Sequence, residues 1–307
     1  MEKVMLKSKF VGCLVGSAVG DALGSSFEGS SGLKKLRIGV SFSGRWTDDT
    51  HMMIGVAESL IEHHGFNGKH MAQIFIKRYE QEPWRGYGYG PPRVFEWIKS
   101  GVAWNQAAKR LFGGTGSYGN GAAMRVAPVG ILYHDDSERL RSVVYGQSSI
   151  THDHELGKEG AALQAYAVSL AVKADPSSEL EPYSFLSELK DFTINEVYRR
   201  KLEMIEKSLS ERDKLRIVRE LGNGIEAYNS VPTAICSFLH SPRNFERSLL
   251  YAVSLGGDTD TIGAMTSAIS GAYRGIETIP ERWKIRLEKR AYIEKLAEKL
   301  WQIKRSL

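Results

Sequence analysis

Cysteine is scarce in this sequence. Cys13 and Cys236 are the two cysteines in 307 residues, and their surroundings differ. The chain has no CxxC pair and no cluster of Cys and His, which argues against a disulfide framework and against a structural zinc site. A chain of this length buries enough surface to be stable without either. We therefore expect a reducing, cytoplasmic compartment.

Long apolar runs are also missing. No segment approaches the ~20 apolar residues that a membrane-spanning helix needs, so we expect no membrane partner. Residues 1–20 place basic residues before an apolar run, as a signal peptide does. That run is rich in glycine, however, and no small-residue cleavage site follows it cleanly. We expect these residues to remain in the mature chain.

A strong excess of one charge is absent, because the formal net charge is +5. The basic excess lies mostly in residues 281–307, where apolar residues recur at helical spacing and predict an amphipathic helix. A solvated charged face explains this pattern, and a modest affinity for polyanions is the alternative. Lys and Arg are not gathered with aromatic residues elsewhere, so the sequence does not indicate a nucleic-acid-binding protein.

Strand patterns are few. The best candidate, residues 126–133, is short and contains Pro128. No repeat of regular period and no shift in composition divides the chain. The expected fold is therefore all-α: one compact, single-domain bundle of many helices over residues 1–307. Helical periodicity predicts helices at residues 10–23, 50–64, 71–80, 94–100, 104–110, 155–174, 196–221, 232–239, 245–255 and 261–274.

Two segments combine aspartate and threonine at the start of predicted helices: TDDT at residues 47–50 and DTDT at residues 258–261. Their carboxylate and hydroxyl oxygens are the hard donors that Mg²⁺ and Mn²⁺ prefer. If the segments meet in space, four carboxylates would repel one another unless a cation neutralised them. Helix N-capping alone is the alternative for either segment. The near-repetition favours a metal site, and a cap can also be a ligand.

Glycine-rich segments form a second group of candidates: RGYGYGPP at residues 85–92 and GGTGSYGNG at residues 113–121. The second can bend so that backbone N–H groups face an anion. It is not a P-loop, because no Gly-Lys-Ser/Thr follows it. Tyr118 and Asn120 within it favour a binding loop over a plain flexible linker. Phe112, just before it, is a candidate to stack on a base or to anchor the loop.

Three further features remain. Glycines recur every four residues between residues 12 and 24, which indicates close packing of a helix. That packing does not explain Asp21 or Glu28, and Glu28 could reach a metal ion or a leaving group. His152 and His154 flank an aspartate before a predicted helix, where capping with partly exposed histidines is favoured over metal ligation.

Together these segments resemble the ADP-ribosylglycohydrolase family. The resemblance covers nearly the whole chain in family order, and its ordered set of motifs is specific although each motif alone is weak. The segment from residue 116 to residue 126 is similar to the serine-directed branch of the family. The matching segments are GxxxGDALGxxxE (residues 16–28), WTDDT (46–50), GSYGNGAAMR (116–125), THDHELG (151–157) and GGDTDTIGAM (256–265).

The resemblance implies a central cleft that holds two Mg²⁺ or Mn²⁺ ions. The metal ligands that it implies are Thr47, Asp48, Asp49, Asp258, Asp260 and Thr261. It also implies that a glycine-rich loop holds the diphosphate, that an aromatic residue stacks on adenine and that a second loop lines the distal ribose. The substrate-binding residues are then Gly86, Gly88, Phe112, Gly116, Ser117, Tyr118, Gly119, Asn120 and His152.

The activity that the resemblance implies is hydrolysis of the C1″ glycosidic bond of an ADP-ribosylated substrate. Asp48 or Asp258 would accept the proton of the attacking water, and Glu28 would aid departure of the aglycone. The substrate would be an ADP-ribosylated protein, poly(ADP-ribose) or O-acetyl-ADP-ribose, with nucleic acid expected only as an ADP-ribosylated substrate. We expect a monomer.

Two other functions stay open at this point. One is a non-catalytic ADP-ribose-binding or crystallin-like protein, because a fold does not settle an activity. The other is a magnesium-dependent phosphohydrolase, because DTDT also resembles the DxDxT motif of haloacid-dehalogenase phosphatases. That motif needs a buried strand before it, whereas residues 245–255 predict a helix.

Overall fold

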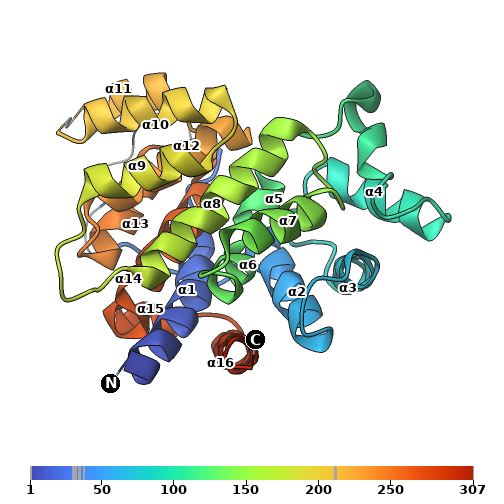
Figure 1. The fold of residues 1–307 in the computed structure, drawn as a ribbon, viewed down its shortest axis with the longest axis horizontal. Helices are drawn as coiled ribbons and strands as arrows, with labels where there is room; N and C mark the ends of the chain where they lie inside the picture. Colours follow the sequence, from blue (N-terminus) through green and yellow to red (C-terminus); the bar gives the residue numbers. More distant parts are fainter. Residues whose placement is uncertain (1, 30–32, 34–35, 37–38, 211–212, 307) are drawn as a thin grey trace.

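The computed structural model describes residues 2–29, 33, 36, 39–210 and 213–306. Within these residues the chain forms helices and no strand, which confirms the predicted all-α class (Figure 1). In the same part of the chain, no helix combines the length and apolarity that a membrane crossing requires.

The α-helices in chain order are α1 (Glu2–Gly24), α2 (Asp48–Glu62), α3 (Gly68–Gln81), α4 (Gly90–Lys99), α5 (Gly121–Met124), α6 (Ala127–Leu132), α7 (Ser137–Ser148), α8 (Glu155–Lys173), α9 (Pro182–Phe192), α10 (Glu196–Ser208), α11 (Lys214–Leu221), α12 (Ala227–His240), α13 (Phe245–Ser254), α14 (Thr259–Arg274), α15 (Glu281–Lys284) and α16 (Arg290–Lys304). Two 3₁₀ helices accompany them, η1 (Ala108–Gly114) and η2 (Ile276–Thr278).

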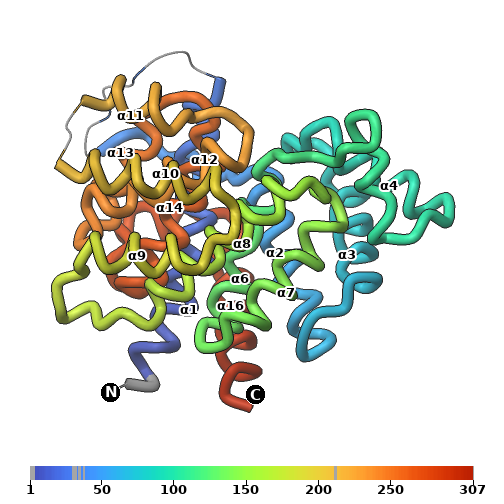
Figure 2. The backbone as a smooth tube through the Cα atoms, turned by 45° about the horizontal axis from the view of Figure 1, so that its top comes forward, coloured from blue at the N-terminus to red at the C-terminus, as the bar shows by residue number. Residues whose placement is uncertain are grey.

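Helix α14 packs along the later part of α1, from about Gly12 to Gly24, in the middle of the molecule (Figure 2). The glycines of α1 make this contact possible. A Cβ on Gly20 would lie 2.2 Å from the Gly263 carbonyl oxygen, and one on Gly24 would lie 2.2 Å from that of Thr259. The regular glycine spacing therefore does indicate close helix packing. It also brings the end of α1 beside the first turn of α14, where the DTDT segment lies.

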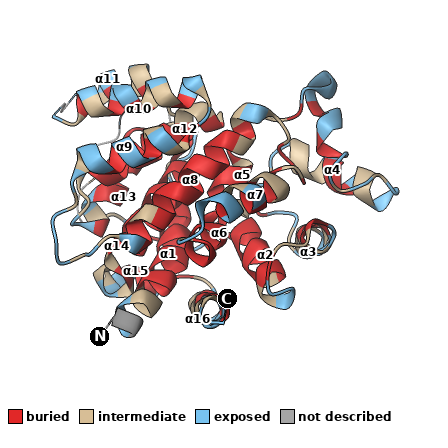
Figure 3. Ribbon diagram, in the orientation of Figure 1, coloured by how far each residue is buried: buried red, intermediate tan, exposed pale blue. Residues whose placement is uncertain are grey.

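The core is centred on α1, α8 and α14, whose residues are mostly buried (Figure 3). Helices α9 to α13 pack on one side of this centre, and α2, α3 and α4 lie on the other (Figure 1). The amphipathic helices α10 and α11 bury one stripe each, as the alternation of apolar and charged residues in them requires. Residues of the site come from both sides of the centre.

One helix expected from the periodicity is wrong in detail, and several helices were not expected. Residues 126–133, the best strand candidate in a chain expected to be all-α, contain helix α6, because Pro128 sits in the first turn, where its missing N–H costs nothing. The helix expected over residues 104–110 is a turn followed by η1. Helices α5, α7 and α9 were not expected, since they are short or weakly periodic.

Two expected long helices are each divided in two. Residues 196–221 form α10 and α11, and residues 211–212 between them lie outside the described residues. Residues 281–307 form α15 and α16, and Leu307 lies outside the described residues as well. The break before α16 includes Lys289 in a left-handed conformation (φ 53°), which apolar spacing does not reveal.

Candidate active site

Both Asp/Thr segments open into one pocket of about 460 Å³. The pocket includes every site residue expected from the sequence except Gly116 and Tyr118. The expected residues that line it are Glu28, Thr47, Asp48, Asp49, Gly86, Gly88, Phe112, Ser117, Gly119, Asn120, His152, Asp258, Asp260 and Thr261.

The TDDT segment begins helix α2, and hydrogen bonds to Asp21 of α1 fix its position. Thr47 is the N-cap residue, and its Oγ1 accepts a hydrogen bond from the Asp49 N–H at 3.3 Å. The buried Asp21 carboxylate accepts hydrogen bonds from the backbone N–H and the hydroxyl of both Thr47 and Thr50, at 2.6–3.0 Å. The capping explanation is thus correct for this segment, and it leaves Asp48 and Asp49 directed to the pocket.

Replacing Asp21 by asparagine is expected to destabilise the protein by about 2–4 kcal/mol, because the side-chain amide would place N–H groups against N–H and O–H donors in a buried site. Asp21 accepts every one of these bonds, so no rotation of an amide satisfies them all. Urea unfolding of Asp21→Asn measures the loss. An unfolding free energy equal to that of the wild type would contradict this role for Asp21.

The DTDT segment begins helix α14. Gly256 and Gly257 precede it with φ of 72° and 77°, and a Cβ on Gly257 would lie 2.1 Å from the Asn223 carbonyl oxygen. The Asp258 N–H donates to that oxygen at 2.9 Å, and the Asp258 carboxylate accepts a hydrogen bond from the Asn120 side-chain amide. This turn needs glycine, and it aims Asp258 at the glycine-rich loop.

The two segments meet at Asp49 and Thr261. The Thr261 Oγ1 lies 3.4 Å from the Asp49 Oδ2, whereas the Asp49 Oδ1 is buried and has no hydrogen-bond partner. Carboxylate oxygens of Glu28, Asp258 and Asp260 lie within 4.8 Å of one another, so these three side chains could hold a metal ion. The unpartnered oxygen and the hard-donor set both fit a divalent cation such as Mg²⁺ or Mn²⁺.

Burial and mutual repulsion oppose ionisation of these carboxyl groups. Burial raises the pKa of Asp48 to about 8, and the nearby charge of Asp21 adds to the shift. The pKa of Asp49 is raised well above its usual value by burial and by Asp260, and that of Asp260 by burial and by Asp258. A cation among them would reverse this cost, because it favours the charged form.

The glycine-rich loop, residues 113–121, lines the same pocket as the start of α2. The Ser117 Oγ accepts a hydrogen bond from the Gly119 N–H at 3.1 Å, and the Asn120 N–H donates to the Ile225 carbonyl at 2.9 Å. Tyr118 packs against His154 and Tyr228, outside the pocket lining. Contact of Gly116 and Tyr118 with a substrate therefore stays a prediction.

Among the residues that line the pocket, Phe112 is exposed and His152 is buried. Phe112 is 59 % exposed and has a left-handed backbone (φ 50°), which is unusual for an aromatic residue and favours a functional role. His152 is buried, with its Nδ1 2.8 Å from the Thr151 Oγ1. Burial and the nearby Arg125 lower the pKa of His152 to about 3, so its imidazole is neutral at physiological pH.

The sequence reasoning missed several lining residues, of which Arg125 is the most unusual. Its guanidinium is fully buried, donates to the side chain and the carbonyl of Gln147 at 2.7 and 2.8 Å, and leaves Nη1 without a partner. Arg125 ends the GSYGNGAAMR motif, which was a usable signal. The other missed residues are Met52, Pro91, Gly121, Met124, Thr151 and Ile225, whereas Tyr89 and Gly90 belong to the loop of residues 86–90 that was expected to line the distal ribose.

Known proteins share both the sequence and the fold of this chain. ADP-ribosylhydrolase ARH3 of Xenopus tropicalis is 37 % identical over 343 residues, covering 96 % of this chain and 95 % of that protein. Human ADP-ribosylhydrolase ARH3 is 35 % identical over 96 % of this chain and 93 % of its own length. ADP-ribosylarginine hydrolase Tri1 of Pseudomonas putida is 25 % identical, covering 94 % of this chain and 77 % of that protein.

A solved structure described as an ADP-ribosylglycohydrolase-related protein complex superimposes with a TM-score of 0.79. It is 27 % identical and covers 98 % of this chain and 99 % of that one. The family model for ADP-ribosylglycohydrolase matches residues 2–306, which include both Asp/Thr segments and the glycine-rich loop between them. The pocket is therefore built from segments that the family model spans, and the chain belongs to the ADP-ribosylglycohydrolase family.

Proposed function

We propose that this protein is an ADP-ribosylhydrolase that cleaves the C1″ glycosidic bond of an ADP-ribosylated substrate and releases ADP-ribose. One observation carries the proposal: the two Asp/Thr segments and the glycine-rich loop line the same pocket, in a chain whose relatives are named ADP-ribosylhydrolases. An acidic end and a loop of backbone donors suit a ligand with ribose hydroxyls at one end and a diphosphate next to them.

The acidic end would hold two divalent cations through Thr47, Asp48, Asp49, Asp258, Asp260 and Thr261, with Glu28 beside them. The donor set supports this assignment, because it is made of carboxylate and hydroxyl oxygens, as Mg²⁺ and Mn²⁺ prefer. When bound, such ions would neutralise the carboxylates and polarise the oxygens of water and of ribose hydroxyls.

The side chains of the pocket then have separate tasks. Asp48 or Asp258 accepts the proton of the water that attacks C1″; Asp258 is already fixed by the amide of Asn120. Glu28 is exposed at the pocket, which suits a group that aids departure of a large aglycone. The division parallels that of a glycosidase, which pairs a base with an acid across the scissile bond.

The glycine-rich loop would hold the diphosphate through Ser117, Gly119 and neighbouring amides. Phe112 would stack on the adenine, and Gly86 and Gly88 would lie along the distal ribose. What supports these assignments is that Phe112, Gly86 and Gly88 line the same pocket as Ser117 and Gly119. The neutral His152 supplies no positive charge, so it would contact the ligand as a hydrogen-bonding group.

A release assay tests the proposal. The purified protein is incubated with peptides that carry serine-linked or arginine-linked ADP-ribose, in Mg²⁺, Mn²⁺ or EDTA. We expect free ADP-ribose to appear from the serine-linked peptide in the presence of metal, since residues 116–126 are similar to the serine-directed branch. Tight binding of ADP-ribose without release from any linkage would instead support a binding protein, and phosphate release would support a phosphohydrolase.

A monomeric state and a cytoplasmic location stay predictions.

A further inference from the structure

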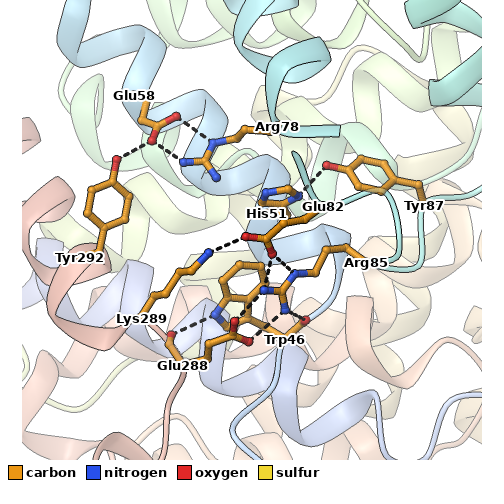
Figure 4. A network of polar contacts seen from close by, with 10 residues as sticks. All are labelled: Trp46, His51, Glu58, Arg78, Glu82, Arg85, Tyr87, Glu288, Lys289 and Tyr292. Carbon is orange, nitrogen blue, oxygen red and sulfur yellow. Dashed lines mark hydrogen bonds and ion pairs between the residues drawn. The ribbon is translucent and has the colours of Figure 1, made fainter. Parts of the chain in front are cut away.

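Behind the acidic end of the pocket, three segments far apart in the sequence converge on Arg85. They are residues 44–48 before and at the start of α2, residues 82–88 after α3, and residues 286–289 before α16. The Arg85 network, as we use the term, comprises Trp46, Glu82, Arg85, Glu288 and Lys289 (Figure 4). Trp46 and Arg85 lie in segments that the sequence analysis named, but it assigned no function to any member of the network.

Arg85 is 8 % exposed, and its guanidinium is fully engaged. It donates to both carboxylate oxygens of Glu288, at 2.9 and 2.6 Å, to Glu82 at 2.6 Å and to the Trp46 carbonyl at 3.0 Å (Figure 4). It also stacks on the Trp46 indole, 3.8 Å from the ring centre. A planar fork with several fixed donors is what arginine supplies and lysine does not.

Further hydrogen bonds fix the segment at residues 286–289. The Glu288 N–H donates to the Gly44 carbonyl and the Trp46 indole N–H donates to the Glu288 carbonyl, both at 3.0 Å. Lys289 keeps its left-handed backbone while its ammonium binds Glu82 at 2.7 Å. A non-glycine residue in this conformation costs about 1 kcal/mol or more and persists where its surroundings hold it.

The network reaches the pocket through the backbone of Arg85. The Asp48 N–H donates to the Arg85 carbonyl at 2.8 Å. The next residue, Gly86, lies so close that a Cβ on it would be 3.6 Å from the Asp48 Oδ1. Asp48 and Gly86 both line the pocket. A shift of the Arg85 side chain would therefore move Gly86 relative to Asp48.

We infer that Arg85 and Glu288 are positioning residues that set the separation between Asp48 and the Gly86–Gly88 loop. Residues near the C-terminal helix thereby determine the geometry of the reacting end, although none of them lines the pocket. The inference rests on the proposed function. Isolated ion pairs at surfaces contribute little to stability. The Arg85–Glu288 pair differs because it is mostly buried and bidentate, and because the Arg85 carbonyl accepts a hydrogen bond from Asp48, a proposed catalytic residue.

The test uses Arg85→Lys and Glu288→Gln, with Glu206→Gln as the matched control. Glu206 forms an ion pair with Lys190 at 3.0 Å, between α9 and α10 on the other side of the molecule (Figure 1). Lysine keeps the charge of Arg85 but cannot make all its bonds at once. If Arg85→Lys does not fold, Glu288→Gln carries the test, because its amide oxygen still accepts one bond.

Two quantities are measured for each variant: kcat for ADP-ribose release, and Mn²⁺ affinity by calorimetry. Both are measured at a temperature at which thermal unfolding shows that the variant is folded. We expect kcat to fall by roughly 10- to 100-fold, as small displacements of reacting groups do, and Mn²⁺ affinity to fall several-fold. Glu206→Gln keeps both values. A merely structural role would lower the melting temperature alone, so a wild-type kcat or a wild-type Mn²⁺ affinity in the folded variants overturns the inference. Absence of release by the wild-type protein would instead contradict the proposed function.

Discussion

Asp48→Asn is expected to lose nearly all turnover, by roughly 10³-fold or more, while remaining folded. Asparagine has the shape of aspartate but not its charge, so it neither accepts a proton nor binds a hard cation as strongly. The N–H of residue 48 would still donate to the Arg85 carbonyl, so the start of α2 is preserved. The release assay with the substrate identified for the wild type measures the effect.

The same loss is expected for Asp260→Asn, whose carboxylate belongs to the group with Glu28 and Asp258. The control is Asp135→Asn, an equivalent change at a surface residue paired with Lys304 far from the pocket. It should retain wild-type turnover. Unchanged turnover in either Asp48→Asn or Asp260→Asn would defeat the assignment of these residues as metal ligands.

Stability separates this loss from unfolding. In the metal-free protein, Asp48 lies among carboxylates that repel it, and burial disfavours its charge. Asparagine cannot ionise, so it avoids the cost of protonating this carboxyl on folding. The melting temperature in EDTA is therefore expected to be unchanged or higher, whereas most substitutions at well-packed positions lower it. An inactive variant that is at least as stable as the wild type would show that Asp48 serves the reaction at the expense of the fold.

The sequence predicted the acidic end of the pocket well because Asp and Thr mark it chemically. Residues 47–50 and 258–261 were each recognisable as possible helix caps and as hard oxygen donors, and their repetition suggested that they meet. Thr47 does cap α2, whereas Asp258, at the N-cap position of α14, makes no side-chain capping bond. The glycine spacing in α1 likewise predicted a close helix contact. That contact is what brings Asp260 beside Glu28, a juxtaposition that no local pattern states.

The supporting residues could not be predicted in this way. Arg85 and Glu288 are separated by 203 positions, and each looks like an ordinary surface charge in its own segment. Arg125 reads as the polar end of a helix, yet it is buried against Gln147. Local periodicity reports which face of an element is apolar, and it does not report which buried polar groups will find one another across the fold.

Removal of metal is expected to abolish turnover and to make stability depend on pH. The folded-state pKa of Asp48 is raised to about 8 from an ordinary value of 3.8. The metal-free folded protein therefore binds a proton that the unfolded chain has already released at neutral pH. Stability then falls as pH rises through the folded pKa, because the folded state must give up that proton.

Thermal unfolding of the wild type and of Asp48→Asn in EDTA at about pH 7 and about pH 8.5 measures this dependence. The buried Lys9, whose pKa is lowered to about 8 by burial, titrates in the same window and raises stability as pH rises, so the contribution of Asp48 is the difference between the two proteins. Relative to Asp48→Asn, we expect the melting temperature of the wild type to fall by roughly 2–5 °C between the two pH values. The shift of Asp48 is worth about 1 kcal/mol over this interval, and 1 kcal/mol corresponds to ~2–4 °C for a chain of this size or somewhat smaller. Excess Mg²⁺ should raise the melting temperature, and more so at the higher pH, because the bound cation replaces the lost proton as the counter-charge. Two results together would mean that the four aspartates of the two segments do not form a cation site: a wild-type melting temperature that is independent of Mg²⁺, and one that changes with pH as that of Asp48→Asn does.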